Sequence, residues 1–260
     1  MVYAAVIDTH CHLDVAAFDD DREAVLDRAV AAGVRRVIVP AIRPSTWQKL
    51  IAWARARSAV AIAIGVHPQV VPALALVERR SIDQLARAAI DAGAIAIGEC
   101  GLDGATGDHE EQERILRLHI RAAREARLPL IVHVLRAHDA APRILEEERA
   151  HEVGGVLHSY SGGRALVGRY VDLGFHISFA GPVSWPGARR PLEAARVVPR
   201  ERLLAETDAP DQSPEPHRGG RCEPAFVVEV IAAIARARGE DPAEVAAFTS
   251  ANASRLFSLP

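Results

Sequence analysis

The sequence predicts an α/β fold of the (β/α)8 class, a TIM barrel that residues 1–260 form as a single domain. Eight short apolar runs alternate with segments in which apolar residues recur every three or four positions. A chain of 260 residues has the length of one such barrel. An open doubly wound sheet is the alternative, and the lack of a glycine-rich phosphate-binding motif after the first apolar run disfavours it.

The predicted strands are short apolar runs, as expected of strands buried on both faces. In chain order they are Ala4–Ile7, Arg36–Val39, Val60–Ile64, Ala94–Gly98, Leu130–His133, Gly155–His158, Phe175–Phe179 and Leu203–Glu206. The predicted helices are Arg22–Ala32, Thr46–Ala56, Ile82–Ala92, Gln112–Ala126, Ala140–Glu148, Ala165–Leu173, Leu192–Val197, Ala225–Ala237 and Pro242–Phe257. Gly33, Gly93 and Gly174 stand where helices are expected to end. The longest irregular stretch, Pro210–Glu223, follows the last strand.

The composition is that of a globular protein without a strong charge field. Hydrophobic residues make up 49% of the chain, charged residues 25%, and the formal net charge is -3, which gives no general attraction for nucleic acid. Arginine is abundant while Lys49 is the only lysine, so a scattered arginine is weak evidence of a nucleic-acid surface. Three cysteines without metal-type spacing favour a reduced, cytoplasmic setting. No stretch has the length of a membrane span, and no obligatory protein partner is indicated.

The first predicted strand leads into the motif Asp-Thr-His-Cys-His-Leu at positions 8–13. Because side chains alternate along a strand, His10 and His12 project to the same side and can bind one metal ion. An isolated pair of this kind is also explained as one satisfied polar group and one histidine present by chance, so residues elsewhere in the sequence are needed to choose between the two explanations.

Further polar residues follow the other predicted strands. In a TIM barrel the C-terminal strand ends surround the active site. Those ends carry His10, His12, His67, Glu99, Asp103, His133, His158, Glu206 and Asp208. Gathered without a cation, such imidazoles and carboxylates would suffer desolvation and mutual repulsion. The sequence therefore predicts a metal site whose ligands are His10, His12, Glu99, His133, His158 and Asp208.

Nitrogen and oxygen ligands suit zinc, manganese or magnesium, and this set exceeds what one four-coordinate zinc ion needs. We therefore expect two divalent ions bridged by a carboxylate. Glu99 is the expected bridge because its strand lies opposite that of His10 and His12 in an eight-stranded ring. A carboxylated lysine is excluded as the bridge, since Lys49 lies in a predicted helix. Such a centre can hold a bridging hydroxide as nucleophile, and Asp208 can bind one ion and accept the proton of the attacking water.

Seven motifs occur together along the chain. They are Asp-Thr-His-Cys-His-Leu-Asp (8–14), Gly-Val-His-Pro (65–68), Gly-Glu-Cys-Gly-Leu-Asp (98–103), Leu-Pro-Leu-Ile-Val-His (128–133), His-Ser-Tyr-Ser-Gly (158–162), Glu-Thr-Asp-Ala-Pro (206–210) and Thr-Ser-Ala-Asn-Ala-Ser-Arg-Leu-Phe (249–257). In combination they resemble the TatD family of metal-dependent deoxyribonucleases over essentially the whole chain. The resemblance implies an amidohydrolase-type TIM barrel, two divalent ions and hydrolysis of phosphodiester bonds in DNA.

The resemblance also implies which ligands hold which ion. His10, His12, Glu99 and Asp208 would hold one ion, and Glu99, His133 and His158 the other. The expected substrate is single-stranded DNA or a frayed end, which could enter a barrel mouth too small for a duplex. Leu135 stands where the family usually has an arginine, so the neighbouring Arg136 becomes the candidate for phosphate contact. His67 is the second such candidate, unless it fixes the turn before Pro68, and Cys222 stands where asparagine is common.

Other polar residues carry weaker assignments. Glu206 and Asp103 could each orient a metal-bound histidine. Four residues on predicted loops could bind phosphate or could be surface charges: Arg164, His217, Arg218 and Arg221. Five histidines are predicted to be structural: His109, His119, His138, His151 and His176.

Two other functions stay open at this point. The same dinuclear centre could cleave an ester, a lactone, a phosphotriester or a cyclic amide, and the near-neutral charge and Leu135 are compatible with that. A non-catalytic barrel that serves as a binding protein is the second alternative, and the intact ligand set argues against it.

Overall fold

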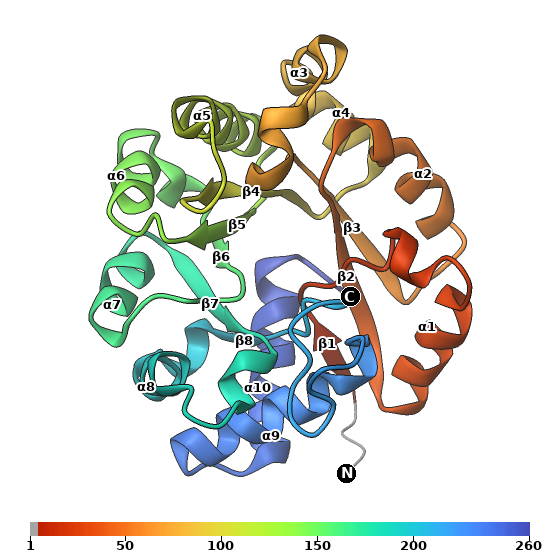
Figure 1. Ribbon diagram of the computed structural model, residues 1–260, viewed down its shortest axis with the longest axis vertical. Helices are drawn as coiled ribbons and strands as arrows, with labels where there is room; N and C mark the ends of the chain where they lie inside the picture. Colours follow the sequence, from red (N-terminus) through yellow and green to blue (C-terminus); the bar gives the residue numbers. More distant parts are fainter. Residues whose placement is uncertain (1–4) are drawn as a thin grey trace. The chain divides into compact units, whose positions relative to one another are not determined.

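The computed structural model describes residues 5–260 (Figure 1), so Ala4 of the first predicted strand lies outside the described residues. Eight strands alternate with helices, as predicted. The strands are β1 (Val6–Asp8), β2 (Val34–Ala41), β3 (Val60–Ile64), β4 (Ala96–Asp103), β5 (Leu130–Leu135), β6 (Gly155–Leu157), β7 (Phe175–Phe179) and β8 (Leu203–Ala205). Their order in the sheet is their order in the chain. This is the βα array that the sequence predicts.

Ten α-helices are present among the described residues. They are α1 (Arg22–Ala31), α2 (Pro44–Ala54), α3 (Leu76–Ile82), α4 (Leu85–Ala92), α5 (His109–Ala126), α6 (Ala140–Glu147), α7 (Arg164–Asp172), α8 (Arg189–Val197), α9 (Val227–Arg238) and α10 (Pro242–Leu256). Short 3-10 helices are η1 (Ala16–Phe18), η2 (Pro68–Ala73), η3 (Ala150–Glu152), η4 (Gly181–Ser184), η5 (Arg200–Arg202) and η6 (Pro224–Phe226). Among residues 5–260, no helix is long and apolar enough to cross a membrane.

Among residues 5–260, helix α3 is the one α-helix for which the sequence predicted no helix of its own. A single helix was expected over Ile82–Ala92, whereas α3 ends at Ile82 and α4 begins at Leu85. Leu76 and Val77 at the start of α3 are 76% and 70% exposed. Because its apolar side chains do not all face the core, α3 lacks the amphipathic pattern that makes a helix recognisable.

Strand β4 runs well past its predicted end at Gly98. A Cβ atom at Gly101 would lie 1.9 Å from the carbonyl oxygen of His133, and one at Gly98 would lie 2.4 Å from that of Ile131. Only glycine permits β4 to approach β5 so closely. These glycines mark close contact between two strands and not the end of one, so the predicted end was wrong. The strand thereby carries Glu99 and Asp103 in a fixed backbone.

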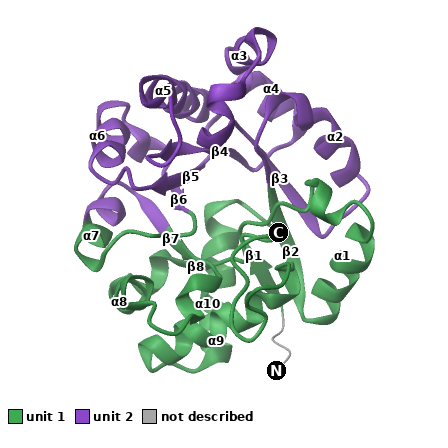
Figure 2. Ribbon diagram, viewed as in Figure 1, with its two compact units in different colours: residues 1–39, 158–168, 177–260 green, residues 40–157, 169–176 purple. Residues whose placement is uncertain are grey.

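The chain forms two compact units, which Figure 2 colours separately. Of the described residues, unit 1 comprises 5–39, 158–168 and 177–260, and unit 2 comprises 40–157 and 169–176. In unit 1, β1 pairs with β2 and β7 pairs with β8, both in parallel. In unit 2, β3, β4, β5 and β6 pair in succession, again in parallel. Parallel pairing brings the C-terminal ends of the strands of each unit to one edge. That the chain is a single domain stays a prediction.

In unit 1, β1 and β8 are joined beyond their regular ends. The N–H of Thr9 donates to the carbonyl of Ala205 (3.3 Å), and Cys11 forms a parallel bridge with Ala209. The closing motif on α10 supports the same strands, since Asn252 Nδ2 donates to the carbonyl of Leu203 at 2.9 Å. These bonds fix the backbone that carries the residues following β1 and β8.

Candidate active site

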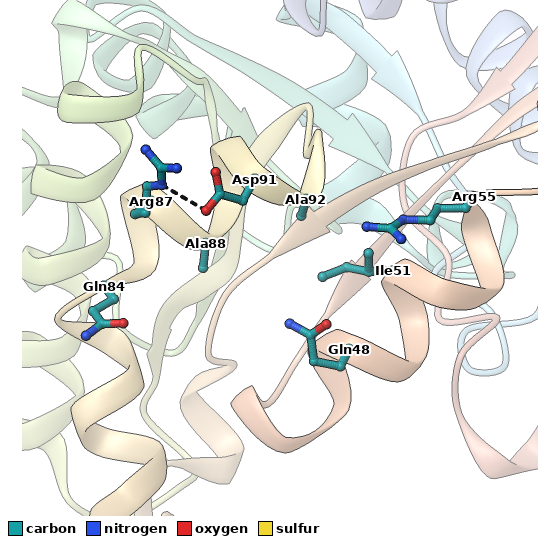
Figure 3. A pocket seen from close by; sticks show the side chains of 8 residues that line it. All are labelled: Gln48, Ile51, Arg55, Gln84, Arg87, Ala88, Asp91 and Ala92. Carbon is teal, nitrogen blue, oxygen red and sulfur yellow. Dashed lines mark hydrogen bonds and ion pairs between the residues drawn. The ribbon is translucent and has the colours of Figure 1, made fainter.

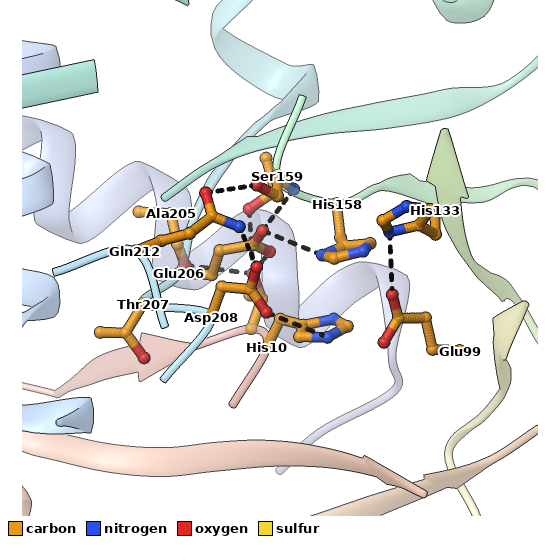
Figure 4. A network of polar contacts seen from close by, with 12 residues as sticks. His10, Glu99, His133, His158, Ser159, Ala205, Glu206, Thr207, Asp208 and Gln212 are labelled. Carbon is orange, nitrogen blue, oxygen red and sulfur yellow. Dashed lines mark hydrogen bonds and ion pairs between the residues drawn. The ribbon is translucent and has the colours of Figure 1, made fainter. Parts of the chain in front are cut away.

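The first cluster of candidate residues lies in unit 1 (Figure 4). His10, His158 and Glu206 are buried, and each offers a ligand atom within 4.8 Å of the others. The rings of His10 and His158 are stacked with their centroids 3.9 Å apart. Nδ1 of His158 lies 3.5 Å from Oε1 of Glu206. Sequence reasoning named both histidines as metal ligands, and the structure brings them together.

His12 and Asp208 complete this cluster. Nε2 of His12 lies 3.2 Å from Nε2 of His10, and each nitrogen lies 3.7 Å from Oδ1 of Asp208. Two ligands of one tetrahedral zinc ion, each bound at about 2.1 Å, are separated by roughly 3.4 Å. The three donor atoms therefore have the chemistry and the spacing that a divalent ion requires. His10, His12, His158, Glu206 and Asp208 together form what we call the unit 1 cluster.

Asp8 holds the two chain segments of the unit 1 cluster in register. Its Oδ1 accepts hydrogen bonds from the N–H of Thr207 (2.9 Å) and of His10 (3.3 Å), and its Oδ2 accepts one from the hydroxyl of Thr207 (2.6 Å). Burial raises the pKa of Asp8 to about 8, against the lowering effect of the bonds from Thr207. Sequence reasoning assigned Asp8 no role beyond its place in the motif.

Glu206 lies behind His158, where it was predicted to orient a histidine. Its Oε1 accepts a short hydrogen bond from the N–H of Ser159, and its Oε2 accepts one from the hydroxyl of Thr9 at 3.3 Å. Burial acts to raise the pKa of Glu206, but its contact with His158 and the charge of nearby His10 outweigh burial, so the net direction is downward. That Glu206 orients a metal-bound histidine stays a prediction.

The second cluster lies in unit 2, at the ends of β3, β4 and β5. Oε1 of the fully buried Glu99 lies 2.9 Å from Nε2 of His67 and 3.2 Å from Nδ1 of His133. These three residues, which we call the unit 2 cluster, offer ligand atoms within 4.8 Å of one another. The sequence predicted Glu99 and His133 as ligands and His67 only as a substrate contact, so the structure adds His67 to the group.

The ring of His67 also caps η2. Its Nδ1 accepts a hydrogen bond from the N–H of Gln69 at 3.1 Å. A neutral imidazole whose Nδ1 is an acceptor carries its proton on Nε2. In this arrangement the ring proton of His67 is on Nε2, the nitrogen that lies 2.9 Å from Oε1 of Glu99. The alternative explanation from the sequence, that His67 fixes the turn at Pro68, therefore agrees with the structure.

Asp103 lies behind His133, as predicted. Its Oδ2 lies 3.6 Å from Nε2 of His133 and accepts a hydrogen bond from Gln69 Nε2 at 2.8 Å. The contact with His133 holds the pKa of Asp103 well below its usual range. Gln112 fixes the backbone here, because its Oε1 accepts from the N–H of Asp103 at 2.8 Å and its Nε2 donates to the carbonyl of Gly107 at 2.8 Å. Sequence reasoning missed Gln112.

His119 on α5 supports the turn that carries His67. Its Nε2 accepts from the N–H of Val66 at 3.0 Å, and its Nδ1 lies 2.8 Å from the carbonyl oxygen of Ile115. Burial lowers the pKa of His119 to about 4, which keeps the ring neutral and its Nε2 an acceptor. The prediction that His119 is structural agrees with these contacts.

Arg136 follows β5 and is exposed. With Asp103, His109 and Asp139 it lines a cavity of about 300 Å³. Among residues 5–260, no side chain forms an ion pair with Arg136. Leu135, the neighbour of Arg136 in the chain, is the last residue of β5. Arg136 is thus an exposed cation that follows His133 by three residues in the chain, and its contact with phosphate stays a prediction.

Most of the other candidate loop residues form contacts with side chains of the protein itself. Arg221 binds Asp21 at 2.7 Å, Arg218 lies 4.8 Å over the ring of Trp185, and His217 stacks on a phenylalanine, Phe226, at 3.7 Å. These contacts favour structural roles. Arg164 is exposed at the start of α7, and Cys222 is buried with its thiol near the carbonyl of Thr207 (3.8 Å).

The remaining histidines are placed as follows. His138 Nδ1 lies 3.0 Å from the hydroxyl of Tyr170, His176 is largely buried, and His109 and His151 are exposed. All are outside the two clusters. Cys11, Cys100 and Cys222 are buried free thiols.

Comparison with known proteins decides the family. The model of the family described as TatD related DNase matches residues 7–258. The chain belongs to the TatD family. A metal-dependent hydrolase of uncharacterised activity from Bacillus subtilis, YabD, is 34% identical over 98% of this chain and 99% of its own length. A Salmonella typhimurium protein named 3'-5' ssDNA/RNA exonuclease TatD is 34% identical over 98% and 99%.

A solved TatD structure confirms the fold class. YjjV of Escherichia coli, a TatD homologue, superposes with a TM-score of 0.91 at 32% identity, covering 98% of each chain. The chain is therefore an α/β barrel with eight parallel strands, and the predicted fold class is correct. It is also a metal-dependent hydrolase of the TatD family. The unit 1 and unit 2 clusters are buried sets of histidine and carboxylate side chains of the kind that such an enzyme needs.

Proposed function

We propose that this TatD hydrolase is a divalent-metal-dependent nuclease that cleaves phosphodiester bonds in single-stranded or frayed DNA. The observation that carries the proposal is the pair of buried His/carboxylate clusters in a chain of this family. The Salmonella relative, whose name describes an exonuclease acting on single-stranded DNA and RNA, supports the substrate class.

The proposed cofactors are two divalent ions of zinc, manganese or magnesium. His10, His12 and Asp208 would hold one ion, because their donor atoms lie 3.2 to 3.7 Å apart. Glu99 and His133 would hold the other, with Glu99 as the ligand that both ions share. The sharing and the assignment of His158 to the second ion rest on the sequence and the family resemblance, so both stay predictions.

When bound, divalent ions act as Lewis acids on a phosphate and favour ionisation of the attacking water at neutral pH. Within the protein, Asp208 would accept the proton of that water, a role open to a carboxylate placed beside His10 and His12. His67 would donate from Nε2 to an oxygen of the phosphate, as its bonded Nδ1 allows. Arg136, a cation that no carboxylate of the described residues pairs with, would contact the phosphate next along the strand.

A substrate panel tests the proposal. The purified protein is stripped of metal with a chelator, reloaded with Mn²⁺ or Zn²⁺, and given labelled single-stranded DNA, duplex DNA, RNA, simple esters and cyclic amides. We expect single-stranded DNA to be cleaved faster than duplex DNA, and no cleavage before metal is restored. Turnover of an ester or a cyclic amide without turnover of any nucleic acid would overturn the nuclease proposal and favour the other amidohydrolase chemistry. A cytoplasmic location stays a prediction from the sequence.

A further inference from the structure

The two oxygens of the Asp208 carboxylate have different surroundings. Oδ1 faces the ring nitrogens of His10 and His12, at 3.7 Å from each. Oδ2 accepts a short hydrogen bond from the side-chain amide of Gln212, which Figure 4 draws beside it. A carboxylate that is held by one oxygen presents the other in a fixed direction. Nothing in the sequence pattern pointed to Gln212, which lies in the irregular stretch after β8.

Gln212 is itself held from its other end. Its Oε1 accepts a hydrogen bond from the hydroxyl of Ser159 at 2.8 Å. Since an ionised carboxylate can only accept hydrogen bonds, the amide nitrogen has to face Asp208 and the amide oxygen has to face Ser159. Ser159 also donates its N–H to Glu206, the residue behind His158. The amide of Gln212 therefore has one orientation that satisfies both of its ends.

The backbone adopts costly conformations along this chain of contacts. Ser159, Asp208 and Gln212 have φ angles of 42°, 55° and 55°, in the left-handed region that residues other than glycine occupy rarely. Such conformations persist only where surrounding contacts hold them, and they cluster at functional sites. The N–H of Asp208 donates to the carbonyl of His10 at 2.9 Å, and the N–H of Asp211 donates to the carbonyl of Asp208 at 3.0 Å. The first bond ties Asp208 to the segment of His10, and the second closes the tight turn that precedes Gln212.

We propose that Gln212 is a positioning residue for Asp208. Its amide binds Oδ2, so that Oδ1 alone is presented on the side of His10 and His12, in one orientation. Asp208 would then bind an ion through a single oxygen that needs no reorganisation. Partners of this kind behind a metal ligand typically change metal affinity by about 10- to 100-fold. The proposal rests on the ion site proposed for the unit 1 cluster.

Two substitutions at Gln212 separate positioning from packing. Gln212→Met keeps the length of the side chain and removes the donor, whereas Gln212→Glu replaces the donor with a group that repels Asp208. Ser159→Ala leaves the amide in place and removes only its anchor. The matched controls are Gln48→Met and Gln48→Glu. Gln48 is exposed in a surface hollow between α2 and α4 that Ile51 and Arg55 also line (Figure 3).

Co²⁺ is the probe. It is titrated calorimetrically into metal-free protein, and the visible absorption of the loaded protein reports the ligand geometry independently of activity. Thermal unfolding first verifies that each variant is folded. We expect Gln212→Met to weaken one Co²⁺-binding step by about 10- to 100-fold and to change the absorption bands. Gln212→Glu should weaken that step further and Ser159→Ala less, while both Gln48 variants stay within about twofold of the unsubstituted protein.

Unchanged Co²⁺ affinity and an unchanged spectrum in folded Gln212→Met and Gln212→Glu would overturn the positioning role. Failure of the nuclease proposal is a separate result, because Co²⁺ binding is measured without a substrate. A protein that binds Co²⁺ as expected but cleaves no nucleic acid would refute the nuclease proposal and leave the role of Gln212 supported. An unsubstituted protein that binds no Co²⁺ would overturn both.

Discussion

Replacing His119 with glutamine should make the stability of the metal-free protein less sensitive to acid. The ring of His119 is completely buried on α5, and both of its nitrogens are engaged. Nε2 accepts the N–H of Val66, so a second ring proton would point at another donor. Protonation in the folded state would therefore break the bond to Val66 as well as bury a charge.

The magnitude follows from the pKa. Burial lowers the pKa of His119 from 6.5 to about 4 in the folded protein. Between these values the unfolded chain binds a proton that the folded chain does not. The stabilisation is thus fully present above pH 6.5 and is lost as the pH falls towards 4. The difference corresponds to roughly 3 kcal/mol of unfolding free energy, most of which is lost by about pH 4.5.

Urea unfolding of chelated protein at pH 7.0 and pH 4.5 measures this effect. His119→Gln should be less stable than the unsubstituted protein at pH 7.0, by about 1 to 3 kcal/mol for the disturbed hydrogen bonds. Its loss of stability between the two pH values should be smaller by roughly 2 kcal/mol, the part of the full difference that falls between pH 7.0 and pH 4.5. His109→Gln, at the exposed first position of the same helix, is the matched control and should follow the unsubstituted protein. Parallel pH dependence in the His119 variant and the unsubstituted protein would refute the reasoning.

Three further predictions concern the active site. In elemental analysis, Glu99→Gln should lower the bound metal at both ion sites, while His133→Ala should lower it mainly at one. Loss of a single ion per chain in both variants would exclude Glu99 as a shared ligand. In a binding titration, Arg136→Ala should weaken binding of single-stranded DNA more than Arg164→Ala does. The affinity of the unsubstituted protein should depend only modestly on salt, because few phosphates are neutralised. Equal small effects of the two substitutions would make Arg136 a surface charge. Asp208→Asn should slow single-turnover cleavage by about two to four orders of magnitude, and a metal-replete variant with a near-normal rate would remove Asp208 from the mechanism.

Much of the fold could be read from the sequence because the strands are short, apolar and bounded by turn residues. β3 and β7 were predicted to the residue. The candidate ligands were found by one topological rule, that strand ends of a parallel βα array carry the active site. His10, His12 and Asp208 were named in this way, and the structure brings their ligand atoms together.

What the sequence could not supply is contact between distant side chains. Gln112, His119 and Gln212 lie on a helix or a loop, where one polar residue resembles any other. Their roles arise from bonds to Asp103, Val66 and Asp208 that only the folded chain creates. His67 differs from these three residues because its position after a predicted strand marked it as a site candidate. The sequence could not decide whether His67 caps the turn or contacts the substrate.

The most direct test of the central claim, metal-dependent cleavage of single-stranded DNA, is a titration of chelated protein with Mn²⁺. The single-turnover rate of cleavage of labelled single-stranded DNA is measured at each metal-to-protein ratio, with bound metal determined in parallel. We expect no cleavage without metal and a rate that rises to a plateau at about two ions per chain. Cleavage that survives complete removal of metal, or a fully loaded protein that cleaves no nucleic acid, would contradict the account.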